Sequence, residues 1–220
     1  MFKKTTEEKV LRDPVHGYIH VDLQVVWDVI NSSWFQRLRR IRQLGGAYVV
    51  YHCAEHSRFG HSLGVYELVR RMVSEVQDIS NALNEREKVT AMLAGLLHDI
   101  GHGPYSHAFE GVTKTSHEEF TCRIIEENTE ITRILEDCCE GLSKDVADVI
   151  RHESNNPLLS QLISSQLDAD RFDYLLRDAY FTGTKYGEYD LERILRTMRV
   201  HDGKQLVIKE SGVYAVENYI

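Results

Sequence analysis

NEREKVTAMLAGLLHDIGHG, residues 84–103, is the stretch that determines the fold. Asn84 is followed three residues later by Glu87, which is the pattern of a capping box at the start of a helix. An apolar run follows, and the helix must end near Asp99 because a glycine- and proline-rich segment, 101–104, comes directly after it. The stretch therefore predicts a buried helix whose last turn carries an adjacent histidine and aspartate.

The pair His98 and Asp99 carries the first chemical information. A buried carboxylate is costly unless it is paired or bound to a cation. Adjacent helical positions lie about 100° apart, so both side chains can reach one ion at the helix end. A buried His–Asp hydrogen bond alone would also explain the pair. The density of further polar residues just downstream favours a functional site; these residues are His102, His107, Glu110 and His117.

Two other segments can supply further ligands. His61 lies in RFGHSLG, residues 58–64, on a helix whose other face is apolar, and Asp170 lies in SQLDADRFDY, residues 165–174. For the neighbouring Asp168 and Asp173 we favour a solvated acidic face or an ion pair with Arg171 and Arg177.

Most of the remaining chain carries apolar residues at helical spacing. The segments with this pattern are 23–30, 34–44, 61–76, 85–97, 116–127 and 158–180. Near the C-terminus the pattern changes to two short apolar runs around Asp202-Gly203, which is typical of a hairpin turn. The predicted fold class is all-α with a small β-hairpin near the C-terminus.

Composition limits the classes of function. With 42% hydrophobic and 27% charged residues over 220 positions, the chain is typical of a soluble domain with a real core. A net charge of −8 argues against general nucleic-acid binding, which needs a basic face. The first residues do not form a signal peptide, and the apolar runs are too short for a membrane span. Four cysteines without CxxC spacing indicate reduced thiols, so we expect a cytoplasmic protein with no membrane contact.

His61, His98-Asp99 and the distant Asp170 resemble the H…HD…D metal signature of the HD phosphohydrolase superfamily. A longer series of motifs resembles its dNTP triphosphohydrolase branch, which includes bacterial dGTPases and the SAM- and HD-domain dNTPases. The series consists of DPVHG (13–17), FQRLR (35–39), QLGG (43–46), HSRFGHSLG (56–64), HDIGHGPYSH (98–107) and DADRFDY (168–174). The resemblance runs from about Leu11 to the C-terminus.

The resemblance implies a single HD-domain helical bundle over residues 1–220. Residues 1–22 would form an N-terminal arm and residues 23–190 the helical core. Residues 191–220 would begin a C-terminal extension that is cut short in this chain, because family members continue well past this point. A homo-oligomer, either a dimer or a tetramer, is also implied.

The same resemblance implies one divalent metal ion, Mn, Fe, Zn, Ni or Mg, held by His61, His98, Asp99 and Asp170. Two nitrogen and two oxygen ligands suit such ions and leave positions open for water and phosphate oxygen. The implied reaction is hydrolysis of a deoxynucleoside triphosphate at the α-phosphorus, which gives a deoxynucleoside and triphosphate. By the same resemblance, the substrate-binding residues are Gln43 and Leu44 for the deoxyribose, Arg58 and Arg171 for the phosphates, and Tyr174 and Asp178 for the rest of the pocket.

His107 is the main candidate for general acid–base catalysis. Glu110 lies three positions later, on the same helical face if Pro104 opens a short helix, and a carboxylate behind an imidazole fixes its tautomer. His102 and His117 would stabilise phosphate charge. Other basic residues are interpreted as structural or surface groups: His16, His20, His52, His152 and His201 as structural or exposed, and Arg37 and Arg40 as part of a solvated or subunit-contact face.

Other functions remain open from sequence. A 5′-nucleotidase or cyclic-nucleotide phosphodiesterase would keep the metal residues without the Gln43-Leu44 and 168–178 blocks. A non-catalytic nucleotide sensor would use the same pocket. The ionisable cluster argues against a purely structural helical domain.

Overall fold

The computed structural model describes residues 2–219 and is mostly helical. Its elements in chain order are β1 (Lys4–Asp13), β2 (Gly17–Leu23), α1 (Gln24–Asn31), α2 (Ser33–Arg37), α3 (Arg58–Glu75), α4 (Gln77–Ala82), α5 (Glu85–Leu97), α6 (His107–Thr113), α7 (His117–Glu126), α8 (Glu130–Cys138), α9 (Leu142–Ile150), α10 (Pro157–Ile163), α11 (Ala169–Thr182), α12 (Leu191–Thr197), β3 (Met198–His201), β4 (Gln205–Ile208) and α13 (Val213–Glu217). Short 3₁₀ turns lie at Leu38–Arg40, Ala47–Val49 and Glu210–Gly212.

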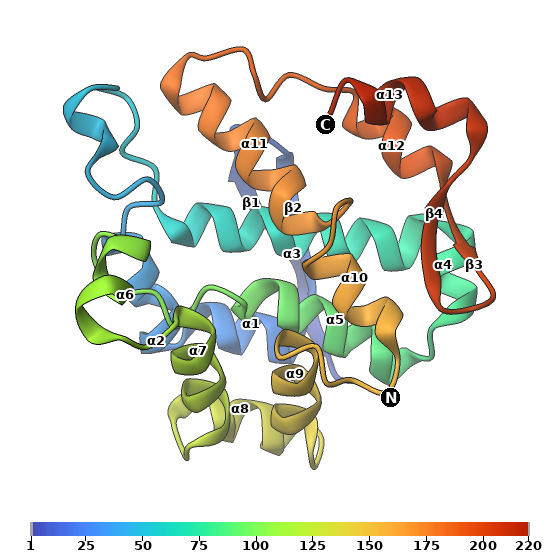
Figure 1. Ribbon diagram of the computed structural model, residues 1–220. Coiled ribbons are helices and arrows are strands. Elements are labelled where there is room, and N and C mark those ends of the chain that lie inside the picture. The colour runs from blue at the N-terminus through green and yellow to red at the C-terminus, as the bar shows by residue number, and fades with distance from the viewer. Residues whose placement is uncertain (1, 220) are drawn as a thin grey trace.

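Helices α3 and α5 lie side by side at the centre of the molecule (Figure 1). Nearly every residue of α5 from Val89 to Leu97 is buried, as the apolar run in the sequence predicts. Helix α11 packs against α3, while α9 and α10 cover α5. The capping box of Asn84 and Glu87 is confirmed: each side chain accepts from the other residue's backbone N–H. This arrangement brings the end of α5 close to both α3 and α11.

The prediction of one long helix over 158–180 is wrong, because the chain forms two separate helices there, α10 and α11. The break lies at 164–168, where Asp168 accepts hydrogen bonds from the backbone N–H of Ser165 (2.5 Å) and of Arg171 (2.6 Å). Asp168 is therefore the N-cap of α11, and it is buried rather than part of a solvated face. A capping side chain satisfies backbone donors that a continuous helix would satisfy internally.

The N-terminal arm is also more ordered than the all-α prediction implies. Strands β1 and β2 form an antiparallel hairpin, with Arg12 opposite Tyr18 and Asp13 opposite Gly17. Gly17 has φ of +78°, a conformation that glycine adopts without strain, and it closes the turn. The C-terminal hairpin is confirmed: β3 pairs with β4 around Asp202 and Gly203, both in the left-handed region. The fold is thus mostly helical, with small hairpins near both ends.

Two helix boundaries differ from the sequence prediction. The helix expected over 34–44 ends at Arg37, and after one 3₁₀ turn the chain becomes extended, with Arg42 forming a bridge to Ser57. The short helix expected from Pro104 begins instead at His107, because Tyr105 and Ser106 have φ of 63° and 50° and interrupt the helical path. Within residues 2–219, none of the helices has the length and apolar character needed to cross a bilayer.

Candidate active site

Three helices that are far apart in sequence place His61, His98 and Asp170 together. His61 comes from the first turn of α3, His98 from the end of α5 and Asp170 from the first turn of α11. One nitrogen or oxygen of each lies within 4.8 Å of those of the other two. His61 Nε2 is 3.0 Å from Asp170 Oδ1, and His98 Nε2 is 3.6 Å from the same oxygen. His61, His98 and Asp170, which the sequence analysis assigned to one metal site, thus lie next to one another in the fold.

Asp99 lies at the edge of this cluster. Its two oxygens are 3.6 Å from His61 Nε2 and 3.5 Å from His98 Nε2. The guanidinium of Arg58 also forms a buried ion pair with it. Burial opposes ionisation of Asp99, but the charges of His98 and Arg58 outweigh burial and hold its pKa well below the ordinary value. Asp99 therefore remains a carboxylate facing the same point.

The two imidazoles test whether a metal ion fits these residues. His61 Nδ1 pairs with Asp173 Oδ2 at 2.7 Å, and His98 Nδ1 pairs with the Gly95 carbonyl oxygen at 2.8 Å. Both acceptors require the proton on Nδ1, which leaves a lone pair on each Nε2. Both Nε2 atoms are buried and have no hydrogen-bond partner in the described part of the chain. Unpartnered lone pairs beside two carboxylates fit a divalent cation.

The local field supports the same assignment. Burial opposes a charge on His61, but the carboxylates of Asp170 and Asp173 outweigh it and raise the pKa of this imidazole to about 10. The carboxylates therefore favour a positive charge at His61 Nε2, and a divalent ion bound there would take the place of the proton. Two nitrogen and two carboxylate ligands suit borderline ions such as Mn, Fe, Zn or Ni and tolerate Mg.

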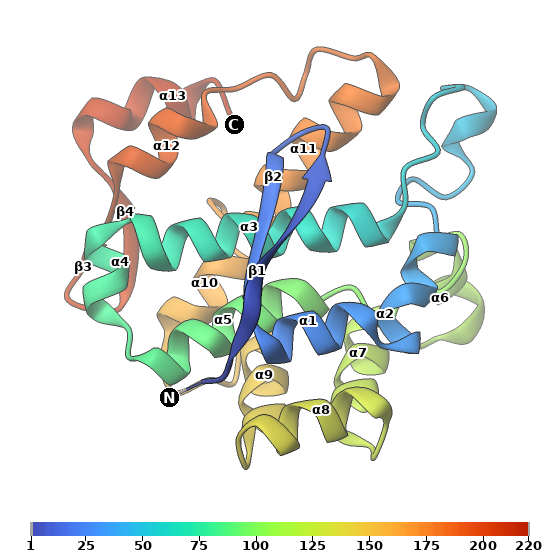
Figure 2. The ribbon, with the colours of Figure 1, turned by 180° about the vertical axis from the view of Figure 1, so that it is seen from behind.

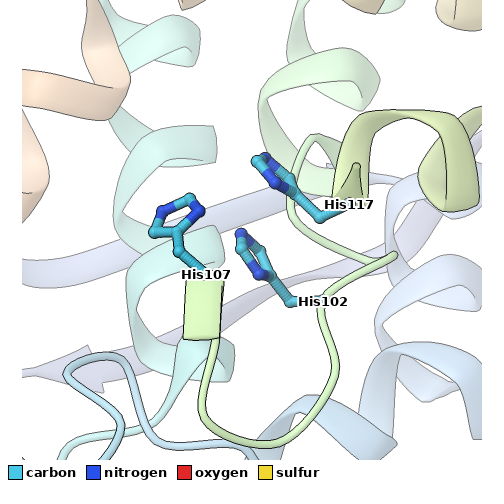
Figure 3. A group of neighbouring side chains, drawn as sticks. All are labelled: His102, His107 and His117. Atoms are coloured by element: carbon cyan, nitrogen blue, oxygen red, sulfur yellow. The ribbon is translucent and has the colours of Figure 1, made fainter. Parts of the chain in front are cut away.

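A second cluster consists of His102, His107 and His117 (Figure 3). His102 is buried, its Nε2 lies 3.3 Å from Asp99 Oδ1, and the ring of His117 stacks on it at 3.8 Å between centroids. His107 faces this stack from α6 with its side chain 70% exposed. Gly101 allows α7 to come this close, because an added Cβ would lie 2.2 Å from the carbonyl oxygen of His117.

Glu110 connects two of these histidines. Its Oε1 lies 2.5 Å from His117 Nδ1 and accepts the His117 backbone N–H at 2.9 Å, while its Oε2 lies 3.3 Å from His107 Nδ1. Burial works against ionisation, but the hydrogen bonds from His117 lower the pKa of Glu110 to about 2. For His102, burial lowers the pKa to about 4. Glu110 is therefore charged and His102 neutral near pH 7.

The three histidines could be read as a second metal site, but their geometry argues against it. The rings of His102 and His117 are nearly parallel, with an interplanar angle of 13°. A ring nitrogen binds a metal through a lone pair that lies in its own ring plane. Two parallel rings stacked face to face cannot both direct such lone pairs at one ion. The cluster is better suited to proton transfer and ligand contact.

A family model described as the HD domain matches residues 58–178, more than half of the chain. The chain belongs to the HD-domain family. The matched segment begins at Arg58, next to the first metal-ligand candidate, and ends at Asp178 in α11. It contains both the His61–His98–Asp170 cluster and the histidine cluster.

Similar proteins agree with this membership. The uncharacterized protein YwfO of Bacillus subtilis is 54% identical over 217 residues, which cover 99% of this chain and 50% of YwfO. Human deoxynucleoside triphosphate triphosphohydrolase SAMHD1 is 32% identical over 227 residues, covering 87% of this chain and 36% of SAMHD1. A crystal structure of a phosphohydrolase (BT4208) from Bacteroides thetaiotaomicron matches with a TM-score of 0.87 and 36% identity, covering 97% of this chain and 51% of that one. The chain spans about half the length of YwfO and of BT4208.

Two of the residues predicted to bind substrate, Tyr174 and Asp178, lie on the helix that carries Asp170. Asp170, Tyr174 and Asp178 follow one another at intervals of four along α11, so they share a face of that helix. Nε of Arg171 and Oε1 of Gln43 are buried and have no partner among residues 2–219. The two other predicted contacts differ in burial: Leu44 is half-buried, whereas Arg58 is buried and held by Asp99 and by Ser106 Oγ.

Two side chains in this region were missed or misjudged from sequence. His56, which the sequence analysis did not single out, pairs through Nε2 with Asp178 Oδ1 at 2.7 Å and stacks on Phe181. Arg37 is not on a solvated face, since it donates to the carbonyl oxygens of His102 (2.9 Å) and Ile100 (2.5 Å) and so connects α2 to the segment after α5. Contacts of this kind join residues distant in sequence and leave no local pattern.

Asp173 is a further correction, because it is completely buried rather than solvated. The alternative that the sequence left open, an ion pair with Arg177, is confirmed at 2.8 Å. Its second role, accepting from the metal-ligand candidate His61, had no signal in the sequence.

Proposed function

We propose that this HD domain hydrolyses deoxynucleoside triphosphates to a deoxynucleoside and triphosphate, using one divalent metal ion. The observation that carries the proposal is the pair of buried, unpartnered Nε2 atoms of His61 and His98, which meet two carboxylates at the junction of three helices. The substrate class is supported by similarity to SAMHD1 proteins, whose name includes this activity, from human and from Dictyostelium discoideum.

In this proposal His61, His98, Asp99 and Asp170 hold the ion. When bound, the ion would polarise the phosphate and lower the pKa of a coordinated water. The protein's own contribution is orientation. Asp173 and the Gly95 carbonyl oxygen hold the Nδ1 protons of the two imidazoles, so that both Nε2 lone pairs face the ion.

His107 is proposed to transfer the proton. Hydrolysis at the α-phosphorus breaks the bond to the 5′-oxygen of the sugar, and that oxygen must gain a proton. Glu110 accepts from Nδ1–H of His107, so the imidazolium form of His107 can give its Nε2 proton to the leaving oxygen and remain as a neutral imidazole with its proton on Nδ1; solvent then restores the Nε2 proton. The exposure of His107 at the start of α6 leaves it accessible to a substrate. His102 and His117 are proposed to contact phosphate oxygens beside it.

The arginines are proposed to offset the charge of the triphosphate. Two aspartates nearly cancel the charge of a divalent ion, so further cations are needed. Arg171 has a buried guanidinium nitrogen without a partner in the described chain and lies one position after Asp170. Arg58 would contribute a second positive charge, and a direct contact with a phosphate oxygen would replace part of its binding to Asp99 and Ser106, which engage all three of its guanidinium nitrogens.

One activity screen tests the proposal. The chain is incubated with Mn²⁺ and, separately, with dNTPs, NTPs, nucleoside monophosphates and cyclic nucleotides, and the products are resolved so that triphosphate is distinguished from phosphate. We expect deoxynucleoside and intact triphosphate from dNTPs. Release of single phosphate from monophosphates would instead indicate a 5′-nucleotidase, and opening of cyclic nucleotides a phosphodiesterase. Nucleotide binding without any turnover would indicate a sensor.

A further inference from the structure

The DPVHG motif, residues 13–17, forms the turn of the N-terminal hairpin, and it lies next to the candidate metal centre. Figure 2 shows the hairpin crossing α3 with its turn beside α11. Asp13 Oδ1 accepts the backbone N–H groups of Val15 and His16, both at 2.9 Å, which gives the turn a fixed shape. Asp13 also binds Arg177 of α11 at 2.9 and 3.2 Å. The turn is therefore anchored to the helix that carries Asp170.

His16 reaches further, to the carboxylate behind a metal-ligand candidate. Its Nε2 lies 2.6 Å from Asp173 Oδ1, and its side chain is only 5% exposed. The other oxygen, Asp173 Oδ2, accepts from His61 Nδ1 at 2.7 Å. Arg177 donates to both oxygens at 2.8 Å. The Asp173 carboxylate is thus held by four contacts, from the N-terminal hairpin, from α3 and from α11 itself.

The close packing of α3 against α11 leaves no room for a side chain at Gly64, beside Asp173. Gly64 lies on α3 one turn after His61, and a Cβ there would lie 1.8 Å from Asp173 Oδ1 and 2.5 Å from a guanidinium nitrogen of Arg177. Any larger residue would displace the carboxylate from its position. The site of Asp173 is built by α3, α11 and the hairpin turn together.

We propose that His16 is a positioning residue for the metal ligand His61, acting through Asp173. A metal-binding histidine depends on the acceptor at its other nitrogen for ring orientation and basicity. The hydrogen bond from His16 fixes Oδ1, which keeps Oδ2 directed at His61 Nδ1. Without it Arg177 is the remaining partner of Oδ1, so the carboxylate is held less firmly and the orientation of the His61 ring is less restricted.

The inference rests on the proposed metal centre, so the test measures metal affinity directly, by competition between the chain and a chromophoric chelator for Mn²⁺ and for Zn²⁺. His16→Ala should weaken binding by roughly 10–100-fold, the usual effect of losing such an outer contact. His16→Gln should restore most of the affinity, because its amide nitrogen can replace Nε2. His20→Ala is the matched control: His20 lies on the same hairpin, pairs with Glu8 at the surface and is 39% exposed.

The melting temperature of each metal-free variant separates positioning from simple stabilisation. A purely structural histidine would lower the melting temperature and leave the affinity of the folded chain unchanged, which would overturn the proposal, as would equal weakening by His20→Ala. Should His16→Ala not fold, His16→Asn replaces it, because the shorter side chain cannot span the contact to Asp173 and must also weaken binding. A wild-type chain that binds neither ion would overturn the metal centre itself, whereas tight binding by wild type and His16→Ala alike overturns only the role of His16.

Discussion

His107 differs from the histidines around it because it is exposed and yet held by a carboxylate. Its Nδ1 lies 3.3 Å from Glu110, and its contacts do not include the four proposed metal ligands. If it delivers the proton to the leaving oxygen, His107→Ala should lower kcat by roughly 10²–10⁴-fold. Metal content, measured by elemental analysis, and nucleotide affinity, measured by calorimetry, should remain close to those of wild type.

The matched control for this prediction is His201→Ala, which removes a histidine of β3 that lies beside Asp202 and is 64% exposed. Its turnover should remain at the wild-type value. Loss of metal from His107→Ala while wild type keeps its ion would mean that His107 is structural, and the proposed proton transfer would be wrong.

Asp170 contributes its carboxylate to the metal centre from a half-buried position on α11. Asp170→Asn keeps the size of the side chain but removes the negative charge that faces His61 and His98. We expect this variant to lose its divalent ion at a chelator concentration that leaves wild type loaded. Asp137→Asn, on the exposed face of α8, is the control and should keep full occupancy. Equal occupancy in the two variants would exclude Asp170 as a ligand.

Helix α11 carries Asp170, Asp173, Tyr174 and Asp178, so the position of its first turn determines the geometry of the site. Asp168 caps that turn by accepting from Arg171 N–H at 2.6 Å. Asp168→Ala should lower the free energy of unfolding by about 0.5–2 kcal/mol, measured by urea denaturation. It should also weaken metal binding, because the first turn that presents Asp170 becomes less ordered.

Asp190 offers the comparison that isolates this second effect. It caps α12 in the same way, accepting from Arg193 N–H at 2.9 Å, but α12 does not contribute to the metal centre. Asp190→Ala should cost similar stability and leave metal affinity unchanged. If both variants bind metal as wild type does, the start of α11 is held by packing rather than by its cap.

The helices that were predicted well are those with strong local signals. Residues 85–97 combine a capping box with an unbroken apolar run, and the structure has α5 there with both capping hydrogen bonds. The N-terminal hairpin was missed because β1 is largely exposed, and its pattern lacks the apolar alternation that identifies a half-buried strand. The break before α11 was missed because Asp168 was interpreted as part of an acidic face rather than as a cap.

For the candidate site, too, the sequence predicted the residues that have a local signal and missed those that depend on packing. His61 and His98 could be singled out from sequence because each is an ionisable residue on an otherwise apolar helix, and Asp170 joined them because the pattern resembles the metal signature of a known family. The partners behind them, Asp173, His16 and the Gly95 carbonyl oxygen, could not, since these contacts depend on how α3, α11 and the hairpin pack. Tertiary contacts of this kind have no periodicity to detect.

At the scale of the whole molecule, the candidate metal centre is a junction of α3 and α5, which are separated by residues 76–84, and of α11, which follows α5 after residues 98–168. The ligand candidates therefore meet only in the packed arrangement, in which α5 and α11 both lie against α3 (Figure 1). Metal binding should in turn stabilise the folded state, because the unfolded chain has no such arrangement of ligands.

The matching segment covers 50% of YwfO, so the full-length relative has further residues that could contact a nucleotide. Two aspartates nearly cancel the charge of a divalent ion at the proposed site, and Arg58 is already paired with Asp99, so few cations here are free to bind a triphosphate. We expect the 220-residue chain to bind metal well but dNTPs weakly, and full-length YwfO to bind dNTPs more tightly and as a larger oligomer. The decisive comparison is full-length YwfO against its own 217-residue matching segment, by calorimetry with a dNTP and by light scattering. Equal affinity, turnover and oligomer size for the two lengths would show that the matched segment supplies all the contacts a dNTP needs.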